Sequence, residues 1–97
     1  LADIATTVDV MWAYTDRAIA LYGEGKLTPE EAAKLKFWTT EREWEVLDTC
    51  VQLHGGYGYI TEYPIARAFL DARVHRIYGG TNEIMREIVG RQLAGRK

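Results

Sequence analysis

The chain has 97 residues with a formal net charge of −2 at pH 7, and 47% of its residues are hydrophobic. That is enough for one small domain or a piece of a larger one, and the charge excludes a strongly basic nucleic-acid-binding protein. Serine is absent, which excludes serine-nucleophile chemistry within the chain, and the single cysteine, Cys50, excludes an internal disulfide and indicates a reducing compartment.

The first predicted element is an amphipathic helix over residues 1–22. Apolar positions recur along it at three- and four-residue steps, and Gly23 and Gly25 end it. The expected inward face comprises Leu1, Ile4, Val8, Met11, Ala18 (or Ile19) and Tyr22. The chain opens as LADIATTVDV, with no initiator Met and no capping residue before the first periodic position. We therefore interpret it as the tail of a longer protein, cut within a helix.

A second, longer helix begins at a complete start signal. Thr28 is the expected N-cap, Pro29 occupies the first turn and Glu31 completes the capping box. The run continues to His54 and ends at Gly55. Its inward face is expected to carry Ala33, Phe37, Thr40, Trp44, Leu47, Val51 and His54. About seven turns with this spacing favour packing against an antiparallel neighbour.

The remaining residues predict two shorter helices joined by irregular segments. Residues 55–63 (GGYGYITEY) are expected to form an irregular connection, Pro64 begins a third helix, and residues 74–78 (VHRIY) favour an extended bend. Thr81 then caps a last helix. The expected inward residues are Ile65, Phe69 and Ala72 in the third helix, and Ile84, Ile88 and Leu93 in the last. The predicted fold class is all-α, an antiparallel helical bundle segment with two long helices plus two shorter ones.

Charge is unevenly divided along the chain. Residues 1–63 carry 5 Lys/Arg against 11 Asp/Glu, whereas residues 64–97 carry 7 against 3. The basic last third suits contact with a phosphate-bearing ligand, and it equally suits docking onto the acidic first part. No apolar run approaches the length of a membrane span, and no signal-peptide pattern is present.

Few side chains form a chemical pattern of their own. Residues 54–59 (HGGYGY) do not satisfy the G-x-G-x-x-G dinucleotide fingerprint, because Thr61 stands where the third glycine is required. Two histidines, one cysteine and scattered carboxylates predict no metal site. Cys50 is expected to be a small buried hydrophobe. Packing in the core or between subunits is expected of the tryptophans Trp12, Trp38 and Trp44.

Two glycine pairs, Gly55-Gly56 and Gly79-Gly80, stand at the edges of helical segments. A left-handed C-cap accounts for Gly55 alone, and a tight turn accounts for the second pair. A glycine pair ahead of a Thr-capped helix also exposes free amide donors at the positive helix end, which suits an anionic or carbonyl-bearing ligand. Taken alone, the residues favour the structural explanation at both pairs.

Two motifs and their separation form a more specific signal. The first is Q-x-x-G-G-x-G-Y at Gln52–Tyr59, and the second is I-Y-x-G-T-x-E-I at Ile77–Ile84, with EYP at Glu62–Pro64 between them. Together they resemble the C-terminal end of the acyl-CoA dehydrogenase family. The resemblance covers essentially the whole of residues 1–97 and identifies them as part of its C-terminal helical domain, with upstream helical and β domains missing. The I-Y-G-G-T turn is most similar to that of the long-chain and isovaleryl branches.

The resemblance implies FAD as cofactor and the α,β-dehydrogenation of acyl-CoA thioesters as reaction. The residues implied to bind the cofactor, partly across a subunit interface, are Gln52, Leu53, His54, Gly55, Gly56, Thr81, Asn82 and Glu83. Those implied to line the substrate thioester are Gly79 and Gly80. By this hypothesis, one glycine of each pair ends a helix or turn, and the other lets the flavin or thioester approach the backbone.

No catalytic residue is expected within the chain. Many members of the family that it resembles place the catalytic glutamate in the turn that here carries Gly79. In the long-chain and isovaleryl branches the glutamate comes from an earlier helix, which here would precede Leu1. The alternative is a branch that has lost dehydrogenation. We therefore expect the 97 residues to be inactive alone.

The resemblance also implies partners and a location. The partners are an acyl-CoA substrate, an electron-transfer flavoprotein-type acceptor and further copies of the chain in a homotetramer, without nucleic acid. The location is the cytoplasm if the protein is bacterial, or alternatively the mitochondrial matrix. Two other functions stay open: a non-catalytic helical assembly module, and a flavin-dependent acyl-CoA oxidase relative.

Overall fold

A computed structural model describes residues 1–95 and consists of helices and turns. In chain order the helices are α1 (Ala2–Gly23), α2 (Pro29–His54), the 3-10 helix η1 (Gly55–Tyr59), α3 (Pro64–Ala72), the 3-10 helix η2 (Arg73–Arg76) and α4 (Asn82–Ala94). The prediction of an all-α fold with two long and two shorter helices is confirmed.

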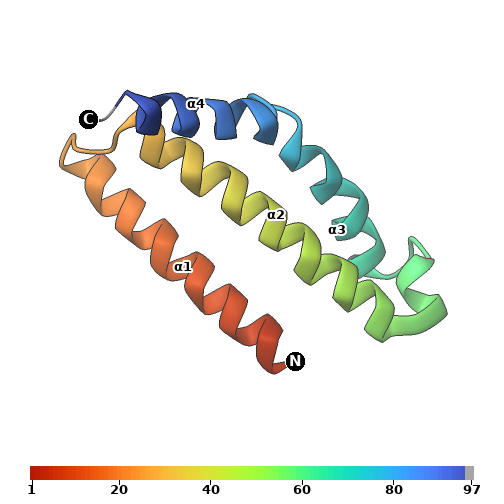
Figure 1. The fold of residues 1–97 in the computed structure, drawn as a ribbon. Helices are drawn as coiled ribbons and strands as arrows, with labels where there is room; N and C mark the ends of the chain where they lie inside the picture. Colours follow the sequence, from red (N-terminus) through yellow and green to blue (C-terminus); the bar gives the residue numbers. More distant parts are fainter. Residues whose placement is uncertain (96–97) are drawn as a thin grey trace.

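Helix α2 is the centre of the arrangement, and it packs against every other helix (Figure 1). Helix α1 runs antiparallel along one side of it, while α3, η2 and α4 lead back along another side. The predicted start of α2 is confirmed: Thr28 Oγ1 accepts a hydrogen bond from the Glu31 amide at 3.1 Å, and Pro29 occupies the first position. The Glu31 carboxylate instead approaches α1, with Oε1 3.7 Å from Arg17 Nη2.

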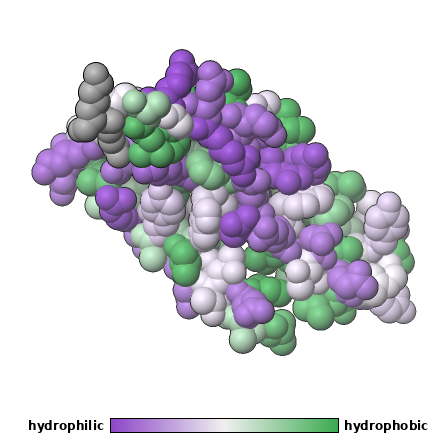
Figure 2. Space-filling model, viewed as in Figure 1, coloured by the Kyte–Doolittle hydropathy of each residue, from purple (hydrophilic) through white to green (hydrophobic). Residues whose placement is uncertain are grey.

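The core along α2 is thin. Among residues 1–95, the buried apolar residues are all alanines, namely Ala18, Ala33, Ala66 and Ala72. The described residues extend over 52 × 23 × 22 Å with a radius of gyration of 15.8 Å, larger than the roughly 13 Å of a compact domain of about 100 residues. The face in Figure 2 accordingly carries apolar side chains beside charged ones. The helices are therefore layered on α2 and do not enclose a deep core.

Two aromatic pairs join α2 to its neighbouring helices. Trp44 of α2 packs on Phe69 of α3 with ring centroids 4.4 Å apart, and Trp38 meets Tyr14 of α1 edge-on at 6.4 Å. These contacts confirm packing roles for Trp38 and Trp44. Trp12, by contrast, is 63% exposed, so packing between subunits stays a prediction for it.

The inward faces of the outer helices differ partly from those predicted. In α1, Ala18 is buried, whereas Val8, Ile19 and Tyr22 are exposed. In α4, Ile84 is 47% exposed and Leu93 is 53% exposed; the half-buried residues are Met85, Ile88 and Val89. The reason in α4 is its first residue, Asn82, which is buried against α2 and thereby fixes the rotation of the helix. Cys50 is half-buried and not fully buried.

The prediction of an extended bend at residues 74–78 was wrong. The segment begins within η2 and continues as a turn, because the amides of Ile77 and Tyr78 both donate to the Val74 carbonyl at 2.9 and 3.1 Å. These local bonds satisfy the backbone that a strand would leave unpaired. His75 of η2 also lies against α2, with Nδ1 2.5 Å from Glu43 Oε1. The predicted irregular connection at residues 55–63 likewise begins with a helix, η1.

Within residues 1–95, none of the helices combines the length and the apolar character needed to cross a membrane.

Candidate cofactor and substrate site

The first predicted cofactor segment, Gln52–Gly56, lies at the C-terminal end of α2. The side chains of Gln52, Leu53 and His54 are exposed. His54 is held back against its own helix, with Nδ1 2.7 Å from the carbonyl oxygen of Cys50. The segment therefore presents an amide side chain and open backbone to its surroundings, and the described part of the chain does not cover it.

The structure explains two of the three glycines at the end of α2 and the start of η1. Gly55 ends α2, and its amide donates to the Gln52 carbonyl. Its φ of 62° favours glycine, but its ψ of −141° lies outside the left-handed helical region, because the chain turns directly into η1. The predicted left-handed cap was therefore wrong. At Gly58 a Cβ would meet the Val51 carbonyl oxygen at 2.4 Å. At Gly56, φ is not positive and a Cβ would have nothing within 4 Å, so the described chain gives no reason for glycine there.

The second predicted segment, Gly79–Glu83, forms the turn into α4. Gly79 and Gly80 have φ of 66° and 93°, and a Cβ at Gly80 would meet Met85 Cε at 2.6 Å. The conformation of the turn therefore requires both glycines. The approach of a ligand to one of them stays a prediction.

Backbone donors are free at this turn. Thr81 caps α4 through its Oγ1, which accepts from the Ile84 amide at 3.3 Å. Within residues 1–95, the amides of Gly79 and Thr81 have no hydrogen-bond acceptor. Unpaired amides at the start of a 13-residue helix form a positive environment that suits a carbonyl or an anion.

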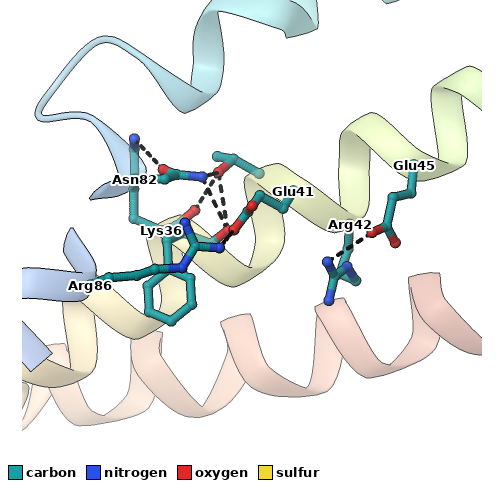
Figure 3. A network of polar contacts seen from close by, with 8 residues as sticks. Lys36, Glu41, Arg42, Glu45, Asn82 and Arg86 are labelled. Carbon is teal, nitrogen blue, oxygen red and sulfur yellow. Dashed lines mark hydrogen bonds and ion pairs between the residues drawn. The ribbon is translucent and has the colours of Figure 1, made fainter. Parts of the chain in front are cut away.

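A buried polar network joins this turn to α2 (Figure 3). Lys36 Nζ donates to the Gly80 carbonyl oxygen at 2.7 Å and to Asn82 Oδ1 at 2.7 Å. Asn82 is only 2% exposed, and its Nδ2 donates to Thr40 Oγ1 at 3.0 Å and to the Phe37 carbonyl at 3.3 Å. All three side-chain hydrogen bonds of Asn82 are thus made with residues of α2, and its side chain holds the turn in place.

Lys36 itself experiences opposing electrostatic effects. Burial lowers its pKa from the ordinary value of 10.5, because the charged form loses solvent, while the carboxylates of Glu83 and Glu41 act in the opposite direction. Desolvation is the larger effect. Sequence reasoning did not single out this lysine. The available signal was its place on α2, three residues after Ala33 and four before Thr40, both on the predicted inward face.

A hollow of about 140 Å³ adjoins the turn. Its walls are Glu41, Arg73, Arg76, Ile77, Thr81, Asn82 and Glu83. The Arg76 guanidinium lies 5.0 Å from the centre of the Trp44 ring, so the aromatic packing of α2 also holds the basic wall in place. Both signs of charge line the hollow. In residues 1–95, no three His, Cys, Asp or Glu side chains are grouped to hold a metal.

The fold keeps the two predicted segments apart. Lys36, which holds the second segment, lies sixteen residues before Gln52 on α2. Since an α-helix rises about 1.5 Å per residue, Lys36 and Gln52 are about 24 Å apart along the helix. A single chain therefore offers two separate contact regions, one at each end of this stretch of α2. The assignment of the individual cofactor and substrate residues stays a prediction.

The sequence profile of the family "Acyl-CoA dehydrogenase, C-terminal domain" matches residues 1–94. The chain belongs to this family. It is 47% identical over 93 residues to the mitochondrial long-chain specific acyl-CoA dehydrogenase of Rattus norvegicus. This alignment covers 96% of the chain and 22% of that relative. It is 36% identical over 93 residues to the caffeyl-CoA reductase-Etf complex subunit CarC of Acetobacterium woodii, covering 96% of the chain and 24% of that relative.

A solved structure gives the same result for the fold. An acyl-CoA dehydrogenase from Geobacillus kaustophilus superimposes with a TM-score of 0.92 at 43% identity, over 95% of this chain and 24% of that chain. The family resemblance and the C-terminal helical fold expected from the sequence are thus confirmed. The chain spans between a fifth and a quarter of the length of these relatives.

Proposed function

We propose that this chain is the C-terminal helical domain of a longer FAD-dependent acyl-CoA dehydrogenase, and that it supplies part of the flavin and substrate site. The free amides at the Gly79–Thr81 turn carry this proposal, because they stand at a positive helix end where a thioester carbonyl or an anionic group would bind. The 47% identity to a long-chain specific acyl-CoA dehydrogenase supports fatty acyl-CoA as the substrate class.

The residues of both segments fit a flavin cofactor. At the end of α2, Gln52 offers an exposed amide, and the space beside Gly56 is open to a close approach. At the start of α4, Thr81 and the neighbouring amides offer hydrogen-bond donors. Since about 24 Å of α2 separates the segments, we propose that they hold distant parts of FAD, with Gln52–Gly56 serving the cofactor of a partner subunit.

The contribution of this chain to the reaction is binding and orientation. The turn would hold the thioester carbonyl by its amides, polarising it as the α-proton leaves. FAD, when bound, accepts the reducing equivalents removed from the acyl chain. The general base would come from an earlier helix of the complete enzyme, because the turn carries Gly79, while Glu87 is directed along α4 towards Arg91 at 3.8 Å. The 97 residues alone are then inactive.

The remaining features of the proposal concern the complete enzyme. The thin core and the exposed apolar side chains of α1, among them Trp12, support burial against further domains or subunits, and we propose a homotetramer. The match to a subunit of an Etf complex supports an electron-transfer flavoprotein as acceptor. The proposed location is the bacterial cytoplasm or the mitochondrial matrix.

The test is the visible absorbance of the complete protein before and after a long-chain acyl-CoA is added. A flavin spectrum that bleaches with substrate is expected. A flavin spectrum that fails to bleach with long, short and branched acyl-CoA would indicate a branch without its base. Absence of flavin would indicate the assembly module and overturn the proposal. Oxygen uptake coupled to bleaching would instead indicate an acyl-CoA oxidase.

A further inference from the structure

Lys36 makes both of its side-chain hydrogen bonds with the turn that the proposed function uses. Its ammonium group donates to the Gly80 carbonyl and to Asn82 Oδ1, both at 2.7 Å. Figure 3 shows Lys36 of α2 beside Asn82 at the start of α4. Asn82 in turn is fixed by Thr40 and Phe37 of α2. One lysine therefore controls a peptide carbonyl and the first residue of α4 together.

The Gly80 carbonyl determines where the next amide points. A trans peptide is planar, so its C=O and N–H groups point in opposite directions. With the Gly80 oxygen bound to Lys36, the Thr81 N–H is directed away from α2, and within residues 1–95 it has no acceptor. Gly80, which precedes this peptide and has no Cβ, would otherwise allow it to rotate at little steric cost on its side.

Docking of α4 onto α2 does not explain the lysine. Arg86, one turn further along α4, is ion-paired with Glu41 of α2, and its guanidinium lies 4.9 Å from the centre of the Phe37 ring. This second link joins the same two helices without touching the turn. An apolar side chain at position 36 would avoid the partial desolvation of the half-buried ammonium group, so the charge is expected to serve the turn itself.

We propose that Lys36 is a positioning residue: it fixes the Gly80–Thr81 peptide so that the free amides of the turn face the bound substrate and flavin. This rests on the proposed function for the identity of the ligands. The orientation of the turn, however, is a property of the chain that can be measured without any ligand.

The test compares Lys36→Met with Arg86→Met in the complete enzyme. Methionine keeps the length of the lysine stem and removes its donors. Arg86→Met removes the ion pair with Glu41, which also joins α2 and α4, and leaves the Gly80 carbonyl bound. We expect Lys36→Met to lower kcat/KM about 10- to 100-fold, the effect of losing a charge-assisted hydrogen bond or of a shift of about 1 Å in positioning. Arg86→Met should change kcat/KM less than about 3-fold for a comparable loss of thermal stability.

Two further measurements separate positioning from general stability. The visible circular dichroism of the bound flavin, and its change with acyl-CoA, should differ from wild type in Lys36→Met alone. A crystal structure of Lys36→Met should show the Gly80–Thr81 peptide rotated or in several orientations.

The outcomes are distinct. A Gly80–Thr81 peptide that keeps its orientation in Lys36→Met, or equal effects of the two variants on kcat/KM, would overturn the positioning role. If the wild-type protein binds no flavin, the proposed function fails, and the peptide orientation in the crystal structure still decides the role of Lys36.

Discussion

The three glycines near the end of α2 should respond differently to the same small substitution. In Gly58→Ala the new Cβ would lie 2.4 Å from the Val51 carbonyl oxygen and 3.1 Å from His54 Cβ. Ordinary contacts begin more than half an ångström further out, so α2 or η1 has to move. Overpacking of this kind costs about 1–3 kcal/mol, and we expect Gly58→Ala to destabilise by that amount. Gly55→Ala should cost a similar amount, about 1–3 kcal/mol, because its φ and ψ are essentially restricted to glycine.

Gly56→Ala serves as the matched control, because this substitution should not destabilise the fold. Its φ is not positive and nothing lies within 4 Å of its added Cβ, so the folded chain accepts it. Loss of a glycine also restricts the unfolded chain, which stabilises by about 0.4–1 kcal/mol. If Gly56 lies against FAD in the complete enzyme, the same methyl group should nevertheless lower flavin retention, and Gly56→Val should abolish it with the helical content unchanged.

Two measurements on the complete protein test this: the urea midpoint followed by far-UV circular dichroism, and the ratio of flavin to protein absorbance. Midpoints are compared directly, because a protein of several domains need not unfold in two states. We expect Gly58→Ala to lower the midpoint and Gly56→Ala to lower only the flavin ratio. The reasoning fails if Gly56→Ala lowers the midpoint as much as Gly58→Ala does. Full flavin content in both Gly56 variants would refute the close approach of the cofactor.

Three other outcomes follow from the contacts of α2. Thr28→Ala should destabilise by about 1 kcal/mol in urea unfolding, because the Glu31 amide loses its cap; an unchanged midpoint would contradict this. Trp44→Ala should cost about 2 kcal/mol, less than the ~3–5 kcal/mol of a fully buried aromatic, because Trp44 is half-buried against Phe69. The pKa of Lys36 is lowered in the folded state, so the unfolded state binds more protons as the pH rises towards 10.5, and the stability of wild type relative to Lys36→Met should increase over that range. A difference in urea midpoint that is independent of pH in the alkaline range would argue against this shift.

Local signals predicted the helices well. Thr28, Pro29 and Thr81 act within one turn of themselves, and the structure places each at the start of its helix as expected. Residues 74–78 show the limit of such signals: the β-branched and aromatic residues favour extended backbone, but the preceding helix α3 and the contact between His75 and Glu43 hold them in a helical turn.

The rotation of α4 was not predictable from its apolar pattern. The pattern favoured Ile84 and Leu93 as inward residues, whereas the structure turns Asn82 and Met85 towards α2. Asn82 is buried, and its polar atoms must be paired once they lose water; three residues of α2 pair them. The free energy of these hydrogen bonds outweighs the gain that burial of Ile84 would give.

The sequence by itself determined the helices, the family and the two glycine-rich segments, because caps, periodicity and motif spacing are properties of neighbouring residues. Only the tertiary structure decided which glycines the chain needs for itself. Gly58 is enforced by the Val51 carbonyl oxygen and Gly80 by its positive φ, while Gly56 has neither constraint. It also decided the place of Lys36, whose partners lie 44 and 46 residues away, because contacts over such distances exist only once α4 has packed on α2.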